Sequence, residues 1–205
     1  HRADGRLVAR HDRRRGVLLT GDRDTYLASN RWGLSGGVRM VRKLLATSGE
    51  RLALEHVLWT AAERRPAFEI ETLNLTEVDA EGRIVAAVSF DPDDRRAASV
   101  ELFDRWIRSD AARWMPPALI EVVHALRAHD LGRLRAALPD GFTFHDHRRA
   151  SAGRLENADE YVAWIAAQFE QSPGAMIEPL YYLAVVPHGT LAGAHRYGTL
   201  AQAGV

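Results

Sequence analysis

A short charged motif that occurs twice decides the fold: HDRRR at His11–Arg15 and HDHRR at His145–Arg149. The two motifs lie 134 positions apart. An acidic, amphipathic segment follows each of them, and Tyr26 in the first corresponds to Tyr161 in the second after a slip of one residue. Self-similarity of this kind indicates that a whole structural unit is duplicated.

A third pair of segments extends the correspondence. Leu52–His56 matches Leu191–His195, now at a spacing of 139 positions. Three anchors in the same order predict a duplicated domain of about 135 residues, a length typical of one domain. We expect a first unit over 1–109 that lacks its opening helices, and a second over 110–205 that lacks its closing hairpin. Such a chain is expected to be part of a longer tandem protein.

Hydrophobic periodicity predicts that each unit is α+β, with helices followed by antiparallel strands. In the second copy we expect helices over 116–128, 130–137 and 157–169, and strands over 142–147, 180–186 and 190–199. In the first copy we expect strands over 39–47, 51–61, 68–78 and 83–90, and a helix over 92–108.

Residue types at the ends of these helices support the boundaries. Asp91 and Asn157 are suitable N-cap residues, and Pro92 suits a first helical turn. An open sheet must bury one face, so the helix at 92–108 or the one at 116–128 is expected to cover the first sheet.

Composition narrows the range of functions. The chain has 205 residues, with 27 basic and 27 acidic side chains and a formal net charge of zero. A neutral chain is poorly suited to nucleic acid, whose binding depends on counterion release. Cys is absent and Lys43 is the only lysine, which argues against thiolate, Cys-based metal, Schiff-base and P-loop chemistry. No long apolar run is present, so we expect a cytoplasmic protein without membrane contact.

The stretch Phe144–Arg149, with Gly153 beyond it and Asp159–Tyr161 on the following helix, resembles SnoaL-like proteins of the nuclear transport factor 2-like superfamily. The same resemblance covers three segments of the first copy, namely Gly49–Leu54, Glu77–Val85 and Phe90–Asp94. It extends over most of the chain as two incomplete copies.

This resemblance implies an α+β cone, in which a strongly curved antiparallel sheet wraps around helices and is open at one end. Relatives use the cone as a pocket for small, mostly apolar ligands. Some are cyclases, isomerases, dehydratases or hydrolases, and others are accessory domains of regulatory proteins. The fold by itself therefore does not decide the function.

Catalysis in such a cone needs an acid or base held in an apolar cavity. Strand alternation places His56 on one face with Leu52, Leu54 and Leu58, and places His195 with Leu191 and Tyr197. Each His is interpreted as a general base or polar anchor inside the cone. The alternative is a partly buried His satisfied by a backbone carbonyl, or one at a subunit interface.

The expected strand at 142–148 offers a second candidate base. Alternation places Phe144 and Asp146 on one face and His145 and His147 on the other. Asp146 is interpreted as a general base, or alternatively as the ion-pair partner of a neighbouring Arg. The two His could chelate a metal, but the sequence offers no third ligand, so no metal and no cofactor are expected.

Aromatic residues follow the long helix of each copy. Tyr26 and Trp32 lie on the first, and Tyr161 and Trp164 share a face of the second. Tyr161 or Tyr197 could donate a hydrogen bond to a developing enolate. The alternative is that these rings pack in the core.

The sequence supports two interpretations of function. The first is an accessory module of a larger, regulatory, bacterial protein that binds a small apolar molecule or mediates association, with a homodimer through the sheet face. Its expected pocket residues are His56, Leu54, Tyr26, Trp32, Trp164, Tyr197 and Phe144. The second is a cyclase, isomerase or dehydratase with His195 or Asp146 as base and Tyr161 as hydrogen-bond donor. Whether a reaction is catalysed stays open at this point.

Overall fold

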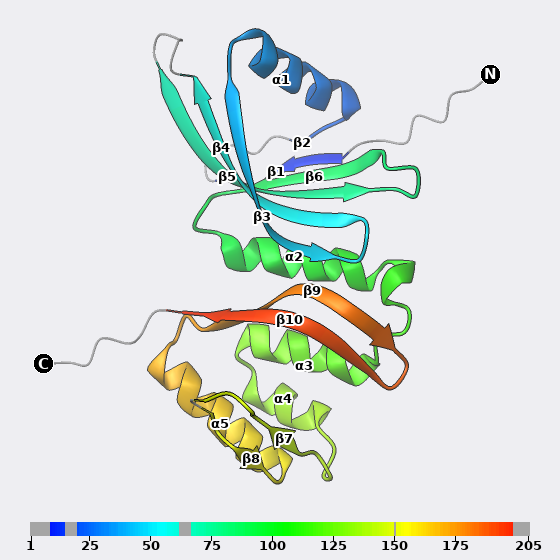
Figure 1. Ribbon diagram of the computed structural model, residues 1–205, viewed down its shortest axis with the longest axis vertical. Helices are drawn as coiled ribbons and strands as arrows, with labels where there is room; N and C mark the ends of the chain where they lie inside the picture. The colour runs from blue at the N-terminus through cyan, green and yellow to red at the C-terminus, as the bar shows by residue number, and fades with distance from the viewer. Residues whose placement is uncertain (1–8, 15–19, 62–66, 150, 199–205) are drawn as a thin grey trace, which may run out of the picture. The chain divides into compact units, whose positions relative to one another are not determined.

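The structure is a computed structural model that describes residues 9–14, 20–61, 67–149 and 151–198 (Figure 1). It is an α+β protein. Its chain divides into two compact units, one comprising His1–Ala112 with Leu180–Tyr182, the other Arg113–Pro179 with Leu183–Val205. Each unit contains both helices and strands.

A six-stranded sheet forms the first unit, with strand order β2-β1-β6-β5-β4-β3. All neighbouring strands are antiparallel except β1 and β6. The strands are β1 (Ala9–Asp12), β2 (Thr20–Gly21), β3 (Arg39–Ser48), β4 (Leu52–Ala61), β5 (Phe68–Val78) and β6 (Ile84–Phe90). The helices are α1 (Arg23–Ser35), α2 (Arg95–Ile107) and a short 3-10 helix, Asp110–Ala112.

The core of the first unit lies where α2 packs on strands β3 to β6. Leu54, Leu75 and Val88 lie side by side in neighbouring strands and are almost completely buried. Phe103 and Trp106 are buried on the helix side. Burying a side chain of this size contributes about 1.5–3 kcal/mol. The expectation that the helix after β6 covers this sheet is confirmed.

The start of α2 differs from the prediction. Asp94 is the N-cap, and the helix begins at Arg95. The N–H of Asp94 donates to the carbonyl of Asp91 at 3.0 Å, so Asp91-Pro92-Asp93-Asp94 first forms a turn. Pro is favoured at the second position of such a turn, which explains why Pro92 turns the chain before the helix begins.

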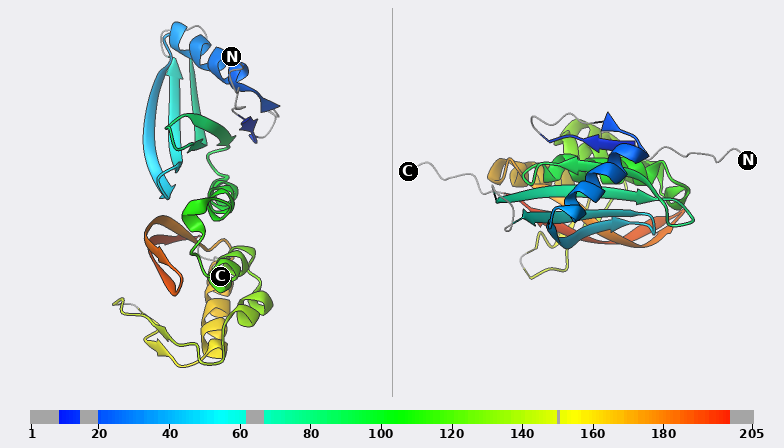
Figure 2. Two further views of the ribbon diagram at one scale, coloured as in Figure 1. Left: turned by 90° about the vertical axis from the view of Figure 1, so that its right-hand side faces the viewer. Right: turned by 90° about the horizontal axis from the view of Figure 1, so that it is seen from above.

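The burial of β4 changes face along its length. Leu52 and Leu54 are buried on one face, whereas Val57 and Ala61 are buried on the opposite face. The first six residues of β3, Arg39–Leu44, are all exposed. The end of the sheet that contains Leu52 and Leu54 therefore carries the core. At the other end, the exposed part of β3 forms one margin of the sheet (Figure 2).

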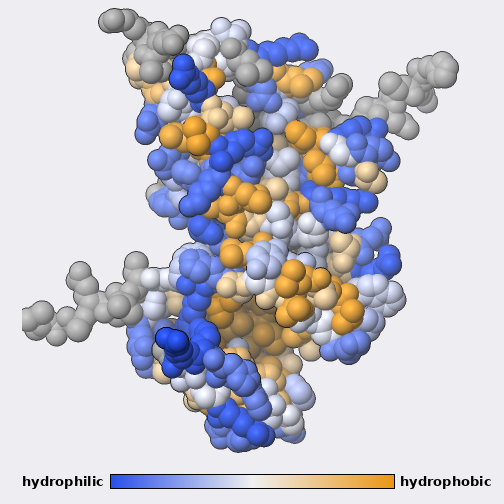
Figure 3. Space-filling view, in the orientation of Figure 1, coloured by the Kyte–Doolittle hydropathy of each residue, from blue (hydrophilic) through white to orange (hydrophobic). Residues whose placement is uncertain are grey.

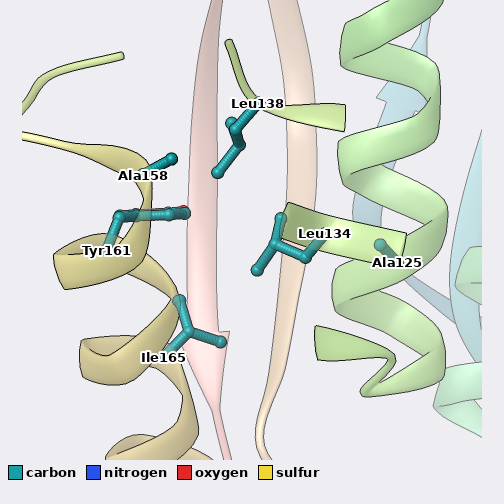
Figure 4. Close-up of a cluster of buried hydrophobic side chains, with 6 residues drawn as sticks. All are labelled: Ala125, Leu134, Leu138, Ala158, Tyr161 and Ile165. Atoms are coloured by element: carbon teal, nitrogen blue, oxygen red, sulfur yellow. The ribbon is translucent and has the colours of Figure 1, made fainter. Parts of the chain in front are cut away.

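Helices dominate the second unit. They are α3 (Pro117–Ala128), α4 (Leu131–Ala137) and α5 (Ala158–Gln171). Two short strands, β7 (Phe144–His145) and β8 (Arg154–Leu155), pair antiparallel before α5, and a hairpin of β9 (Met176–Val186) and β10 (Gly189–Tyr197) follows it. The buried side chains gather between the helices (Figure 4): Ala125, Leu134, Leu138, Ala158, Tyr161 and Ile165.

The cap of α5 agrees with the prediction. The side chain of Asn157 accepts a hydrogen bond from the N–H of Glu160 at 2.9 Å. The carboxylate of Glu160 in turn accepts from the N–H of Glu156 at 2.8 Å. This reciprocal arrangement resembles a capping box and satisfies backbone donors that the helix itself cannot pair.

The strand expected over 142–147 is much shorter in the structure, because β7 covers only Phe144 and His145. Beyond His145, the carboxylate of Asp146 accepts hydrogen bonds from the backbone N–H groups of Arg148 and Ala152. Asp side chains that bond the nearby backbone favour turns over strands. The turn after Asp146 therefore ends the strand.

Candidate functional site

The candidate site is a small hollow in the second unit, lined by α3, α5, the beginning of β9 and the end of β10. It has room for little more than one water molecule. Two Arg side chains, Arg127 and Arg196, interrupt its apolar wall. The apolar lining residues are Leu126, Ile165, Phe169, Ala175, Met176 and Ile177. Figure 3 shows apolar side chains gathered in a depression on this unit.

Helix α5 supplies one side of the hollow. Tyr161, Ile165 and Phe169 recur at intervals of four residues, so they lie on one face of this helix. At the far end of the stripe, the ring of His129 stacks on Phe169 at 3.8 Å between centroids. A ring nitrogen of His129 also lies 2.9 Å from the carbonyl oxygen of Ala175. His129 thus helps to fix the positions of both residues.

An aromatic cluster continues the stripe beyond Tyr161. The Tyr161 ring lies 5.0 Å from Phe144, 5.1 Å from Phe142 and 5.9 Å from Trp164. Phe144 and Trp164 are also in contact, at 5.3 Å. Tilted rings at these distances are a favourable packing geometry. The structure therefore brings three predicted site residues together, namely Phe144, Tyr161 and Trp164.

The guanidinium of Arg196 is one electrostatic feature of the hollow. Burial lowers the pKa of its guanidinium, and the neighbouring Arg148 lowers it further, while Tyr161 acts in the opposite direction. No acidic side chain among the described residues forms an ion pair with Arg196. A partly buried cation without a counter-charge is unfavourable, so a bound anion would stabilise this arrangement.

Arg148, by contrast, forms an ion pair with Asp146. Its Nε donates to Oδ1 of Asp146 at 2.8 Å, and its Nη2 donates to Oδ2 at 2.7 Å. This pairing holds the pKa of the Asp146 carboxyl well below its ordinary value, against the opposing effect of burial. A carboxylate stabilised to this degree binds a proton weakly near neutral pH. The geometry therefore gives no support to Asp146 as a general base.

His195 is placed differently from the expectation. Its side chain is exposed and does not line the hollow. Its ring lies 5.8 Å from that of Tyr197, whose hydroxyl is 3.4 Å from the Sδ atom of Met176. The prediction chose the face of β10 that carries His195 and Tyr197, whereas the intervening residue, Arg196, lines the hollow. The sequence predicted His195 inside an apolar cavity, whereas its side chain is exposed in the structure.

The predicted pocket residues of the first unit belong to two elements, β4 and α1. Leu54 is completely buried in the core under α2. His56 lies two residues further along β4, one-third exposed, with Nε2 3.1 Å from a carboxylate oxygen of Glu71. Tyr26 is half-buried on α1. Trp32 also belongs to α1, but its side chain lies outside the described residues.

Metal chemistry finds no support in the described part of the chain. No group of three or more His, Cys, Asp or Glu side chains there could hold a metal ion. The rings of His145 and His147 are 6.2 Å apart.

Within the described residues, no helix has the length and apolar character needed to cross a bilayer.

Comparison with known proteins adds no assignment: no protein-family model matches the chain, and no curated protein is significantly similar to it. No motif or periodicity of the sequence distinguishes Arg196 or His129. Arg is so abundant in this chain that a single Arg carried no signal. His129 lies between the helices predicted over 116–128 and 130–137, and this position is the only feature that the sequence offers for it.

Proposed function

We propose that the chain contains two incomplete copies of one SnoaL-like α+β unit, and that the second copy binds a small apolar anion. In this proposal the protein is an accessory module of a larger regulatory protein. The observation that carries the binding proposal is the position of Arg196 at the wall of an apolar hollow, without an acidic partner among the described residues.

Strand register supports the duplication. In the first unit, Arg10 pairs with Gly21 and His11 pairs with Thr20. In the second unit, Phe144 pairs with Leu155 and His145 pairs with Arg154. Every member of the second set lies 134 positions after its counterpart in the first. The repeated motif of the sequence thus coincides with a repeated strand pair in identical register.

The elements after each pair also correspond. Helix α1 follows β2, and helix α5 follows β8. Tyr26 and Tyr161 are each the fourth residue of their helix. A hairpin comes next in both cases, β3–β4 in the first unit and β9–β10 in the second. In the first unit two further strands, β5 and β6, extend the sheet.

The chemistry of the hollow indicates the class of ligand. A carboxylate placed against Arg196 would supply the missing counter-charge through charge-assisted hydrogen bonds. The hydroxyl of Tyr161, whose pKa is raised by burial and lowered in part by Arg196, would lie close to the same charge. Because the hollow has room for about one water molecule, only the charged group would enter it, and the body of the ligand would lie against the apolar side chains that border it. A short aliphatic or aromatic monocarboxylate combines these properties.

An enzymatic function receives less support from the geometry. An enolising enzyme would need His195 or Asp146 within hydrogen-bond reach of Tyr161 or Tyr197 in an enclosed site. Asp146 is instead bound to Arg148, and His195 is exposed. We therefore propose binding rather than a reaction.

Isothermal calorimetry with octanoate tests the binding proposal, with octanol and octylammonium as probes of equal chain length. We expect octanoate to bind and the other two to bind at least about tenfold more weakly, since a charge-assisted hydrogen bond contributes roughly 1.5–3 kcal/mol. The variant Arg196→Gln should lose this selectivity. Arg149→Gln, which changes an exposed arginine of the same unit that does not line the hollow, is the matched control. Equal binding of octanoate and octanol, or an unchanged Arg196→Gln variant, would refute the proposal.

A further inference from the structure

Among the described strands of the first unit, two sheet margins have no neighbouring strand. Strand β3 is the last in the strand order, so its outer side has no neighbour among the described strands. Strand β6 pairs with β5 only from Leu73 to Val78. Phe68–Thr72 at the beginning of β5 therefore also has no described strand on its outer side. At this end the described part of the sheet consists of β3, β4 and β5, and neither outer strand pairs with another described strand (Figure 2).

The margin formed by β3 is basic and apolar. Three of its first six residues are basic and three are apolar, and all six are exposed: Arg39, Met40, Val41, Arg42, Lys43 and Leu44. Arg42 pairs with Glu55 of β4. No described acidic side chain forms an ion pair with Arg39 or Lys43.

The margin formed by β5 has the opposite charge. Glu69, Ile70 and Glu71 are exposed, and Phe68 is partly exposed. Glu71 contacts a ring nitrogen of His56, whose charge depends on pH. No described Arg or Lys forms an ion pair with Glu69 or Glu71. The β5 margin is therefore acidic and apolar.

The register assigns these side chains to faces. Val41 and Glu71 both lie opposite Leu58, and Arg39 and Glu69 both lie opposite Thr60. Because side chains alternate, one face of the sheet presents Arg39 and Lys43 at one margin and Glu69 and Glu71 at the other. The opposite face presents Met40 and Leu44 at the first margin, and Phe68 and Ile70 at the second.

We propose that a second copy of this chain adds its β3 to the free margin of β5, so that the two sheets become continuous. Strands β3 and β5 run in the same direction because each is antiparallel to β4. Two copies in the same orientation would thus pair β5 with β3 in parallel. Such pairing sets Arg39 and Lys43 beside Glu69 and Glu71 on one face. On the other face it sets Met40 and Leu44 beside Phe68 and Ile70, while Arg42, which shares that face, is already paired with Glu55.

Charge selects this pairing over the symmetric ones. A β3–β3 contact would bring Arg39 and Lys43 of two copies together, and a β5–β5 contact would do the same for Glu69 and Glu71. Like charges opposite one another in a sheet are destabilising. Pairing of two different margins is head-to-tail, so it can continue from copy to copy. This association goes beyond ligand binding in the second unit and does not depend on it.

Charge on an edge strand can also prevent association, as it does in many natural sheets. Sedimentation velocity over a range of protein concentrations at low salt distinguishes the two roles. The wild-type chain is expected to show a sedimentation coefficient that rises with concentration and falls back as salt is added. The double variants Arg39→Glu/Lys43→Glu and Glu69→Lys/Glu71→Lys should each remain monomeric, because their two margins carry the same charge.

Mixing provides the decisive comparison. The first double variant has two acidic margins and the second has two basic margins, so an equimolar mixture should associate again. Arg31→Glu/Arg51→Glu, which reverses two exposed charges elsewhere in the unit, is the control and should behave as wild type. Far-UV circular dichroism melts establish that each variant is folded. A monomeric wild type, stronger association of either double variant, or a mixture that stays monomeric would overturn the proposal.

Discussion

The guanidinium of Arg148 donates two hydrogen bonds, of 2.8 and 2.7 Å, to the carboxylate of Asp146, and only one residue separates Asp146 from Arg148 in the chain. The same carboxylate accepts hydrogen bonds from the backbone N–H groups of Arg148 and Ala152. This single ion pair closes the turn after β7. The same ion pair engages Asp146, which the sequence suggested as a general base.

The Asp146–Arg148 pair predicts a particular pH dependence of stability. An unfolded Asp has a pKa of about 3.9, and the folded pKa of Asp146 lies well below its ordinary value, chiefly because of Arg148. A lowered folded pKa stabilises the protein above the unfolded pKa, and this contribution is lost as the pH falls through the folded value. Asp146→Asn should therefore melt at a lower temperature than wild type near neutral pH, with a difference that shrinks below about pH 4.

Thermal melts of both proteins from pH 7 down to the acid transition measure this difference. Asp140→Asn, at a fully exposed carboxylate, is the control and should follow wild type closely. A melting-temperature gap for Asp146→Asn that stayed constant through the acid range would show that the carboxylate charge does not stabilise the fold.

The cap of α5 predicts a measurable loss of stability. Replacing Asn157 by Ala removes the acceptor for the N–H of Glu160 and should lower the free energy of unfolding by about 1 kcal/mol. Urea denaturation followed by circular dichroism provides the value. Asn157→Asp keeps an acceptor and should lose far less. Equal losses for the two variants would mean that the cap hydrogen bond is not the cause.

The core of the first unit should be sensitive to truncation at Leu54. This side chain is completely buried under α2, so Leu54→Ala should cost about 2–5 kcal/mol. Leu183 on β9 is 68% exposed, and Leu183→Ala should change the free energy of unfolding by less than about 0.5 kcal/mol. Denaturant titrations of both variants give the comparison. A small effect at Leu54 would contradict the placement of the core.

Most helices and hairpins could be predicted from the sequence. The helix at 157–169 was marked by its N-cap, its acidic first turn and its apolar stripe, and α5 has that cap. The hairpin of β5 and β6 was marked by the Asp79–Gly82 turn, in which Gly82 has a φ of 76°. Local chemistry is enough at these positions, because each signal acts within a few residues.

The predicted element boundaries differ from the structure where a side chain accepts hydrogen bonds from nearby backbone N–H groups. The predicted site residues differ where the answer depends on which face of a strand packs against the helices. Asp146 ended β7 early by accepting backbone hydrogen bonds, and Asp91-Pro92 made a turn before α2. On β10, alternation correctly separated His195 from Arg196, but periodicity cannot say which of two faces meets the helices. That choice depends on tertiary packing, which places Arg196 and not His195 in the wall of the hollow.

The most direct test of the account is an NMR titration that follows the side-chain Nε–H signals of the arginines while octanoate is added. The account predicts a saturable shift of the Arg196 signal, little change at Arg148, and no such shift when octanol is added instead. An unchanged Arg196 signal, or equal small shifts of all arginines, would contradict the claim that the hollow of the second unit binds an apolar anion.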